Sequence, residues 1–470
     1  MGAPACPGCR DRDARIAALE RSLADLPAQV RDWQARLNHN SSNSSLPPSA
    51  NPLNAPTPVV KKKSRRRAGA QPGQPPHRKH LLPPERIQET IVFVPQCCRQ
   101  CQTRWPALAG PTDPPPTRPQ VVELPPVIAQ VTEYQGHSRT CPWCGAVTPA
   151  PIPSELLAHG TGPRWTAALA YLSGGHGISK RGVEEISANL LAAPVALGTV
   201  VNLEQEMSAA LETPHQEALA AVQAADVQHA DETSWKQRAK LCWLWTAAPA
   251  TVVACIIHGQ RRALGLTALL GVAIHGIWCR DRWGVYGRVP PERRQVCWAH
   301  RKRDFQKVVD RGGESQWVGR RGLRLVNEVF AAGHAFQEGQ GTRVQRQASM
   351  EPLANRLQRL LLEGAILGAD KTVAAFGENV LALEPALWTF VRVAGVEPPN
   401  HFMERLWRRA VWWRKRSFGC WSAAGGRFVE RILTVVQTRR LQGQNVLEYL
   451  QAAVCAHRAK QPCPKLLPEA

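Results

Sequence analysis

The chain reads VQHADETSW at residues 227–235, an extended run that carries an aspartate, Asp231, among strand-forming residues. Up to Ala225 the apolar residues recur with a helical period, so the pattern changes here from helical to extended. An aspartate in such a strand is costly to bury unless a partner or a cation compensates its charge. The run therefore predicts a strand with an acid placed for chemistry; a strand-end acid in a turn is the alternative.

Four further elements are expected directly after this strand. They are two apolar strands, a short helix and a strand that ends in an acid, at residues 242–247, 251–257, 263–270 and 276–281. Three strands, a helix and an acid-bearing strand follow one another in the order of a ribonuclease H-like core. The fold class expected for the chain is α+β and multidomain, with a mixed sheet flanked by helices.

Asp231 and Asp281, the acid that ends the last strand, indicate a site for divalent metal ions. Carboxylate oxygens suit Mg²⁺, and a pair of such ions about 4 Å apart can activate an attacking oxygen and stabilise the leaving one. This is the chemistry of phosphodiester cleavage. The expected cofactors are therefore two Mg²⁺ ions, or Mn²⁺ in their place.

A third acid has to come from a distant helix. A helix is predicted after a Pro-Pro pair, with Asn400 as its N-cap and Glu404 in its first turn. Spacing by itself leaves Glu397 and Glu430 open, and a surface ion pair between Glu404 and Arg408 is the other role for that acid. The basic residues expected to hold DNA phosphates beside it are Arg405, Arg408, Arg414 and Lys415.

The composition indicates a nucleic-acid partner. Of the 470 residues, 59 are Lys or Arg and 37 are Asp or Glu, which gives a formal net charge of +22. Such an excess favours a polyanion such as DNA. No apolar run reaches the length of a spanning helix, and residues 1–12 lack the layout of a signal peptide. No membrane partner and a cytoplasmic location are therefore expected.

An amphipathic helix is predicted at residues 10–38. Its apolar residues are spaced alternately by three and four, as in a coiled coil, and are Ile16, Leu19, Leu23, Leu26, Val30, Trp33 and Leu37. Self-association into a homo-oligomer is expected. A single helix that packs on the rest of the protein is the alternative, and Pro27 would kink a continuous coil.

Residues 39–84 are predicted to form a disordered linker, because Asn, Ser, Pro, Gly and cations leave too few apolar groups to order it. The linker contains the run KKKSRRR. Its basic residues are expected to contact DNA phosphates and are Lys61, Lys62, Lys63, Arg65, Arg66 and Arg67. The alternative is a solvated charge run that keeps the segment extended.

Residues 85–153 are predicted to form a zinc-ribbon-like domain. Short β-rich runs lie at residues 91–94, 121–124 and 127–134. Two CxxC pairs, Cys98 with Cys101 and Cys141 with Cys144, have the spacing of a structural four-cysteine Zn²⁺ site. Cys97 offers a competing ligand. A further pair, Cys297 and His300, lacks two more ligands nearby, so a structural or DNA-contacting role is expected for His300.

Four motifs resemble the insertion-sequence-66 family of bacterial DDE transposases. They are HADETSW at 229–235, DRWGVY at 281–286, CWAHRKRDF at 297–305 and NHFMER at 400–405. The flanks resemble the family too: a zipper-like helix, the linker NSSNSSLPP, a four-cysteine segment and a stretch with Arg414, Lys415, Gly419 and Ser422. This chain has His401 where the family typically has a second Asn.

The resemblance implies that Asp231, Asp281 and Glu404 are the metal-binding acids of a transposase. Such an enzyme cleaves DNA at the terminal inverted repeats of a mobile element and joins the ends to target DNA, and accessory proteins of the element are further candidate partners. Two alternatives stay open: an inactive or domesticated zinc-containing DNA-binding protein, and a nuclease of the same fold without strand transfer.

The domain boundaries combine periodicity with this resemblance. After the zinc-ribbon-like domain we expect a helical DNA-binding or support region, the first part of the core, a helical insertion, the last part of the core with C-terminal helices, and a tail. Their expected limits are 154–225, 226–304, 305–396, 397–455 and 456–470.

Overall fold

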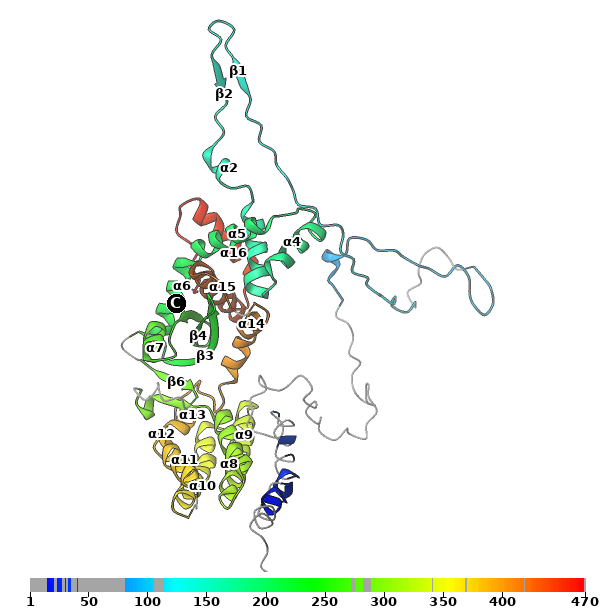
Figure 1. Cartoon of the computed structure of the whole chain (residues 1–470). Helices are drawn as coiled ribbons and strands as arrows, with labels where there is room; N and C mark the ends of the chain where they lie inside the picture. Colours follow the sequence, from blue (N-terminus) through cyan, green and yellow to red (C-terminus); the bar gives the residue numbers. More distant parts are fainter. Residues whose placement is uncertain are drawn as a thin grey trace, which may run out of the picture. The chain divides into compact units, whose positions relative to one another are not determined.

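The structure is a computed structural model of the chain (Figure 1). It describes residues 15–20, 23–27, 30, 33–34, 40, 81–104, 113–271, 275–281, 289–339, 341–367, 370–417 and 419–468. The chain divides into two units, one made of residues 1–55 and 129–470 and the other of residues 56–128. The basic run at 61–67, expected to contact DNA, lies outside the described residues, and so does Leu37.

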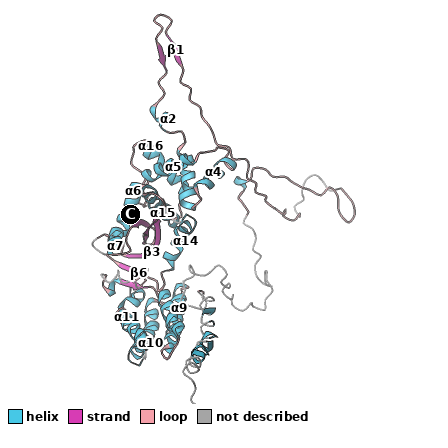
Figure 2. Ribbon diagram, in the orientation of Figure 1, coloured by secondary structure: helices cyan, strands magenta, loops and turns pink. Residues whose placement is uncertain are grey.

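A five-stranded mixed sheet is the largest sheet in the described part of the larger unit (Figure 2). Its strands are β3 (Val227–Gln237), β4 (Lys240–Ala248), β5 (Ala254–His258), β6 (Ile277–Arg280) and β7 (Arg294–Val296), in the order β5-β4-β3-β6-β7. The pairs β3–β4 and β4–β5 are antiparallel, whereas β3–β6 and β6–β7 are parallel. The α+β class and the predicted order of strands are confirmed, and α7 (Ala263–Leu270) has the predicted bounds.

Helix α15 (Ala423–Leu441) covers the outer edge of β5. A strand edge leaves N–H groups unpaired, and these invite pairing with another chain. Here the amides of Val253, Cys255 and Ile257 donate to Thr438 Oγ1, Thr434 Oγ1 and Glu430 Oε1. The acceptors recur every four residues along one helix face and so match the two-residue repeat of the strand.

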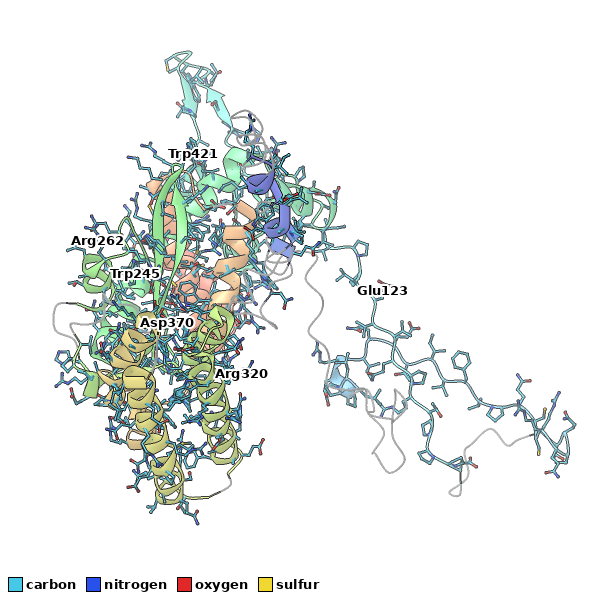
Figure 3. All side chains as sticks on the ribbon, turned by 60° about the horizontal axis from the view of Figure 1, so that its bottom comes forward. Glu123, Trp245, Arg262, Arg320, Asp370 and Trp421 are labelled. Atoms are coloured by element: carbon cyan, nitrogen blue, oxygen red, sulfur yellow. The ribbon has the colours of Figure 1, made fainter. Side chains whose placement is uncertain are left out.

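Helices cover both faces of the sheet. Besides α7 and α15 they are α5 (Leu197–Ala210), α6 (Glu212–Ala224), α14 (His401–Ser417) and α16 (Val446–Arg458). On one face Trp245, labelled in Figure 3, and Trp278 are buried among residues of α5–α7, α15 and α16. On the other face Trp235 packs with Trp407 of α14. Large buried aromatic groups therefore fix α14 against the sheet.

A helical group follows β7 and ends before α14. It comprises α8 (Trp298–Arg311), α9 (Gln316–Gln337), α10 (Arg343–Leu367), α11 (Lys371–Leu381), α12 (Glu384–Leu387) and α13 (Thr389–Arg392). Its buried side chains pack with Cys279 of β6 and Val296 of β7. Asp370, labelled in Figure 3, caps α11 by accepting from the N–H of Thr372 at 2.8 Å. The helical character expected for this segment is confirmed.

The segment before the sheet is helical, as predicted. Beyond α5 and α6 it contains α2 (Ser154–Ala158), α3 (Pro163–Ala170), a π-helical turn (Tyr171–Gly175) and α4 (Lys180–Asn189). Arg409 of α14 donates to the carbonyl of Gly175 in the π-helical turn at 2.9 Å. The segment is thereby tied to the helix that carries Glu404.

The β-rich runs predicted at 91–94, 121–124 and 127–134 form no strand. Most of their apolar side chains are exposed, Phe93 to 89% and Val121 to 93%. β-branched and aromatic residues form strands where neighbours bury them, and these runs lack such neighbours in the described chain. The strands of this region lie elsewhere, as the hairpin of β1 (Ser138–Thr140) and β2 (Val147–Pro149).

The predicted N-terminal helix is helical wherever it is described. Its described seam residues have exposed side chains, from 43% for Val30 to 70% for Leu23. None of the helices in the described chain combines the length and apolarity needed to cross a membrane.

Candidate active site

Asp231 lies near the middle of β3, the central strand. Its cross-strand partner on β4 is Thr246, and its Oδ1 accepts from the backbone N–H of Glu232 at 2.9 Å. The residue keeps part of its surface accessible. Burial, followed by the charges of Glu232, Asp281 and Glu404, nevertheless raises the pKa of Asp231 well above its usual range. Ionised Asp231 therefore lacks full compensation from the protein.

Asp281 and Glu404 reach the same region from β6 and α14. Asp281 directly follows β6, whose parallel pairing with β3 ends at His229–Cys279, so the continued register places Asp281 opposite Asp231. Glu404 lies in the first turn of α14, and its side chain is 45% exposed. Residues 282–286 of the second motif lie outside the described residues.

The three acids share one electrostatic neighbourhood. Asp281 and Glu404 both raise the pKa of Asp231, and both also act on the imidazole of His300 in α8. Coulomb interactions weaken with distance, so these groups lie near one another. Among the described residues, no three His, Cys, Asp or Glu side chains are grouped as a metal site. The three carboxylates thus lie in one region, but in the described residues they are not close enough together to form a metal site.

His401 contacts Glu404 directly. Its Nδ1 lies 3.2 Å from Glu404 Oε2, one helical turn along α14. The residue that stands where the family typically has a second Asn therefore supplies a partner for the third acid.

Comparison with known families bears on these residues. A model described as "Transposase IS66 family" matches residues 160–428, which is more than half of the chain. The chain belongs to the Transposase IS66 family. The match includes β3, β6 and the whole of α14, and with them all three acids. A second model, described as a family of unknown function (DUF6444), matches residues 8–80. No curated protein matches the chain.

Other acids of this IS66-family chain have different partners. Glu430 accepts from the amide of Ile257 at the edge of β5, and burial raises its pKa. Glu397 acts on His229 and Cys279 rather than on Asp231. Of the three acids that spacing left open, Glu404 is the one whose charge acts on Asp231.

Sequence reasoning gave no role to Glu232, the neighbour of Asp231. Its buried carboxylate accepts from Arg261 at 2.8 Å, and the guanidinium of Arg261 lies 4.6 Å from the ring centre of Trp243. Among the neighbouring charges, that of Glu232 raises the pKa of Asp231 most. The sequence signal for this effect is the pair of adjacent acids in one strand. Neighbouring strand residues point to opposite faces, yet their charges stay close enough to interact.

Cys297 and His300 have separate environments. Cys297 is buried, its Sγ accepts from the N–H of Asn400 at 3.2 Å, and burial raises the pKa of its thiol. Such a thiol stays protonated and serves packing. Burial, with Arg303 next, lowers the pKa of His300 to about 4, so its imidazole is neutral at pH 7. Its Nδ1 is buried and finds no hydrogen-bond partner among the described residues.

The basic residues of α14 divide into two groups. Arg405, Arg408 and Lys415 are exposed, on the helix that carries Glu404. Arg414 is partly buried, and its Nη1 donates to Thr233 Oγ1 and Ser234 Oγ of β3, each at 2.7 Å. The guanidinium of Arg414 therefore holds α14 to the acid-bearing strand, and its contact with DNA stays a prediction.

The two CxxC pairs adopt the same local turn. In the first, the N–H of Gln102 donates to Cys98 O, and in the second the N–H of Gly145 donates to Cys141 O. Gln102 and Gly145 have positive φ, 58° and 73°. Hydrogen bonds with Thr103 lower the pKa of Cys101 to about 7, and backbone N–H groups lower that of Cys141. In each turn one thiol, Cys101 or Cys141, is thus favoured as thiolate, the form that binds a metal.

Proposed function

We propose that this IS66-family chain is a DDE transposase with an RNase H-like core. It cleaves DNA strands at the ends of a mobile element and transfers them into target DNA, and Asp231, Asp281 and Glu404 bind its two divalent metal ions, Mg²⁺ or Mn²⁺. The observation that carries this proposal is the electrostatic coupling of three acids from β3, β6 and α14 within the family-matched segment. The strand order β5-β4-β3-β6-β7, with parallel pairing on one side of β3, supports such a core.

The donor set fits a hard divalent cation. All three ligands would be carboxylate oxygens, which Mg²⁺ and Mn²⁺ prefer. The raised pKa of Asp231 marks a carboxylate whose charge the protein leaves undercompensated, and a bound cation would supply the compensation. When bound, such ions activate an attacking oxygen and stabilise the leaving one.

The side chains of this site have distinct tasks in the proposal. Asp231 and Asp281 hold their carboxylates on the sheet, which keeps their spacing rigid. Glu404 approaches from α14 on a solvent-accessible turn. Arg405 and Arg408, exposed in the same part of α14, would bind phosphates of the DNA strand and keep the scissile bond beside the acids.

Two structural features complete the proposal. The CxxC turns of Cys98/Cys101 and Cys141/Cys144 would bind structural Zn²⁺, since each presents two thiols and hydrogen bonds lower the pKa of one of them, Cys101 or Cys141. The exposed apolar seam of the N-terminal helix would be covered by a second copy of the chain in a homo-oligomer. The proposed nucleic-acid partner is DNA, both the terminal inverted repeats of the element and the target DNA.

The proposal predicts metal-dependent cleavage of terminal-repeat DNA by the purified protein. Asp281→Asn and Glu404→Gln should each lose cleavage to background, because each removes one charged ligand. Both should bind DNA normally, because binding rests on exposed cations. Glu448→Gln, which changes a first-turn acid of α16, is the matched control and should cleave like the wild type.

Gel analysis of the products separates the candidate functions. Joined element and target DNA indicates transposition, whereas nicked DNA alone indicates a nuclease of the same fold. Cleavage that survives both acid substitutions would refute the assignment of these residues. DNA binding with no cleavage at any Mg²⁺ or Mn²⁺ concentration would instead favour an inactive DNA-binding relative.

The thiols predict a measurable zinc content. Wild-type protein should retain Zn²⁺ through gel filtration, and the double variant Cys98→Ser, Cys141→Ser should lose it, because each turn then lacks one of its two thiols. Metal analysis by mass spectrometry measures both. Cys455→Ser, an exposed cysteine of α16, is the control and should keep its zinc. Equal zinc in all three proteins would exclude the proposed ligands.

A further inference from the structure

Asn400 immediately precedes α14, but its side chain does not act as an ordinary cap. Its carbonyl accepts from the N–H of Glu404 at 3.3 Å, which opens the helix. Asparagine at this position usually turns its side-chain oxygen toward the first amides of its own helix. Here the side chain is buried, with 6% of the residue exposed, and reaches the sheet instead. The position predicted from the sequence is correct, and the side chain serves a different purpose.

The amide of Asn400 contacts both acid-bearing strands. Its Oδ1 lies 2.7 Å from His229 Nδ1, and its Nδ2 lies 3.5 Å from Ala230 O on β3 and 3.4 Å from Cys279 O on β6. The parallel β3–β6 ladder ends at the pair His229–Cys279. Asn400 therefore lies where the two strands stop bonding to each other, and bridges them there.

The surroundings fix which way this amide points. Two backbone carbonyls lie beside one end, so that end is the NH₂ group and the other end is the acceptor. His229 consequently donates from Nδ1. Phe402 packs edge-on against that ring at 5.2 Å. The backbone N–H of Asn400 donates to Cys297 Sγ at 3.2 Å, which joins the start of α8 to the same point.

Each contact of Asn400 lies close to one acid of the proposed site. Ala230 precedes Asp231, Cys279 lies two residues before Asp281, and the carbonyl of Asn400 starts the turn that carries Glu404. We propose that Asn400 is a positioning residue that sets the relative placement of the three carboxylates by bridging β3 and β6 at the start of α14. This inference rests on the proposed function, because it concerns the same acids.

The test replaces Asn400 with leucine, which keeps the volume and removes the amide. A residue that orients metal ligands typically changes metal affinity or activity by about 10–100-fold when it is lost. Added Mn²⁺ should raise the melting temperature of DNA-free protein, and the Mn²⁺ midpoint is the concentration that gives half of the maximal rise. We expect Asn400→Leu to increase this midpoint about tenfold. The cleavage rate at saturating DNA should fall about 10–100-fold, while the DNA dissociation constant stays within about twofold.

A matched control separates positioning from general stability. Asn445 also precedes a helix, but its Oδ1 accepts from the N–H groups of Leu447 and Glu448 and so caps α16. Asn445→Ala should lower the melting temperature by loss of the cap and leave the Mn²⁺ midpoint unchanged. An Asn400→Leu protein that loses stability yet keeps the wild-type Mn²⁺ midpoint overturns the proposal.

A second pair of variants decides the matter if Asn400→Leu does not fold. His229→Gln keeps a donor for Asn400 Oδ1, so its Mn²⁺ midpoint should stay near that of wild type. His229→Leu removes that donor, so its Mn²⁺ midpoint should be higher. Identical midpoints for wild type, His229→Gln and His229→Leu would overturn the proposal. Failure of the proposed function has a different signature, namely a wild-type protein that binds Mn²⁺ but never cleaves terminal-repeat DNA.

Discussion

Asp231→Asn should abolish DNA cleavage and, in the same protein, raise the melting temperature measured without metal. The cleavage rate should fall by about 1,000-fold or more, equivalent to about 4 kcal/mol of transition-state stabilisation. The carboxylate and the carboxamide have the same shape, so the fold is preserved. What changes is a charge that sits among the charges of Glu232, Asp281 and Glu404.

The stability gain depends on pH in a defined direction. The folded-state pKa of Asp231 is raised above the unfolded value, so between the two values the folded protein binds more protons than the unfolded chain. Wild-type stability therefore falls as pH rises from the unfolded pKa toward the folded one. Asn has no such dependence. The variant should melt about 2 °C or more above wild type at pH 7, and the difference should vanish near pH 3.

Divalent metal provides the decisive control for this prediction. Added Mg²⁺ should raise the melting temperature of wild type and leave that of Asp231→Asn nearly unchanged, because binding to the folded state alone stabilises it. Asp226→Asn, which neutralises an exposed acid just before β3, is the matched variant and should respond to Mg²⁺ like wild type. If Asp231→Asn melts below wild type at pH 7 and responds fully to Mg²⁺, Asp231 is an ordinary strand residue.

The sheet and its acids could be predicted from local pattern, because long strands and α7 carry a clear period. β7 could not, since its three residues show no periodicity and pair only through β6. The runs at 91–94 and 121–124 had strand-forming composition and still form no strand, because propensity expresses burial by neighbours. Local pattern therefore succeeds where neighbouring elements bury the segment, as they do for most of β3 and β6.

Some residues of the candidate site could be predicted from the sequence, and others could not. Asp231 and Asp281 were recognisable because an acid in an apolar strand is unusual, whereas spacing could not choose Glu404 over Glu430. The choice needs a contact between distant segments, the bond from the amide of Ile257 that engages Glu430. The bridging role of Asn400 was hidden for the same reason, since its partners on β3 lie about 170 residues earlier in the chain.

Gly276→Ala should destabilise the protein strongly and remove cleavage, although Gly276 is not a residue of the proposed site. It directly precedes β6 with φ +67°, and a Cβ there would lie 2.3 Å from Asp226 O and 2.6 Å from Ala225 O. Asp226 O also accepts from the N–H of Ile277 at 2.6 Å, the bond that starts the pairing of β6 with β3. Backbone strain and a clash with backbone atoms should together cost about 3 kcal/mol.

A second glycine separates the two contributions. Gly395 has a similar φ of +76°, but a Cβ there would meet open space, so Gly395→Ala isolates the backbone strain at about 1–2 kcal/mol. Denaturant unfolding should rank the proteins as wild type, Gly395→Ala and Gly276→Ala in falling stability. Equal losses at both sites would mean that β6 can shift away from β3 without cost. Gly276 directly precedes β6 and Asp281 directly follows it, so a shift of β6 along or away from β3 would also move Asp281 relative to Asp231.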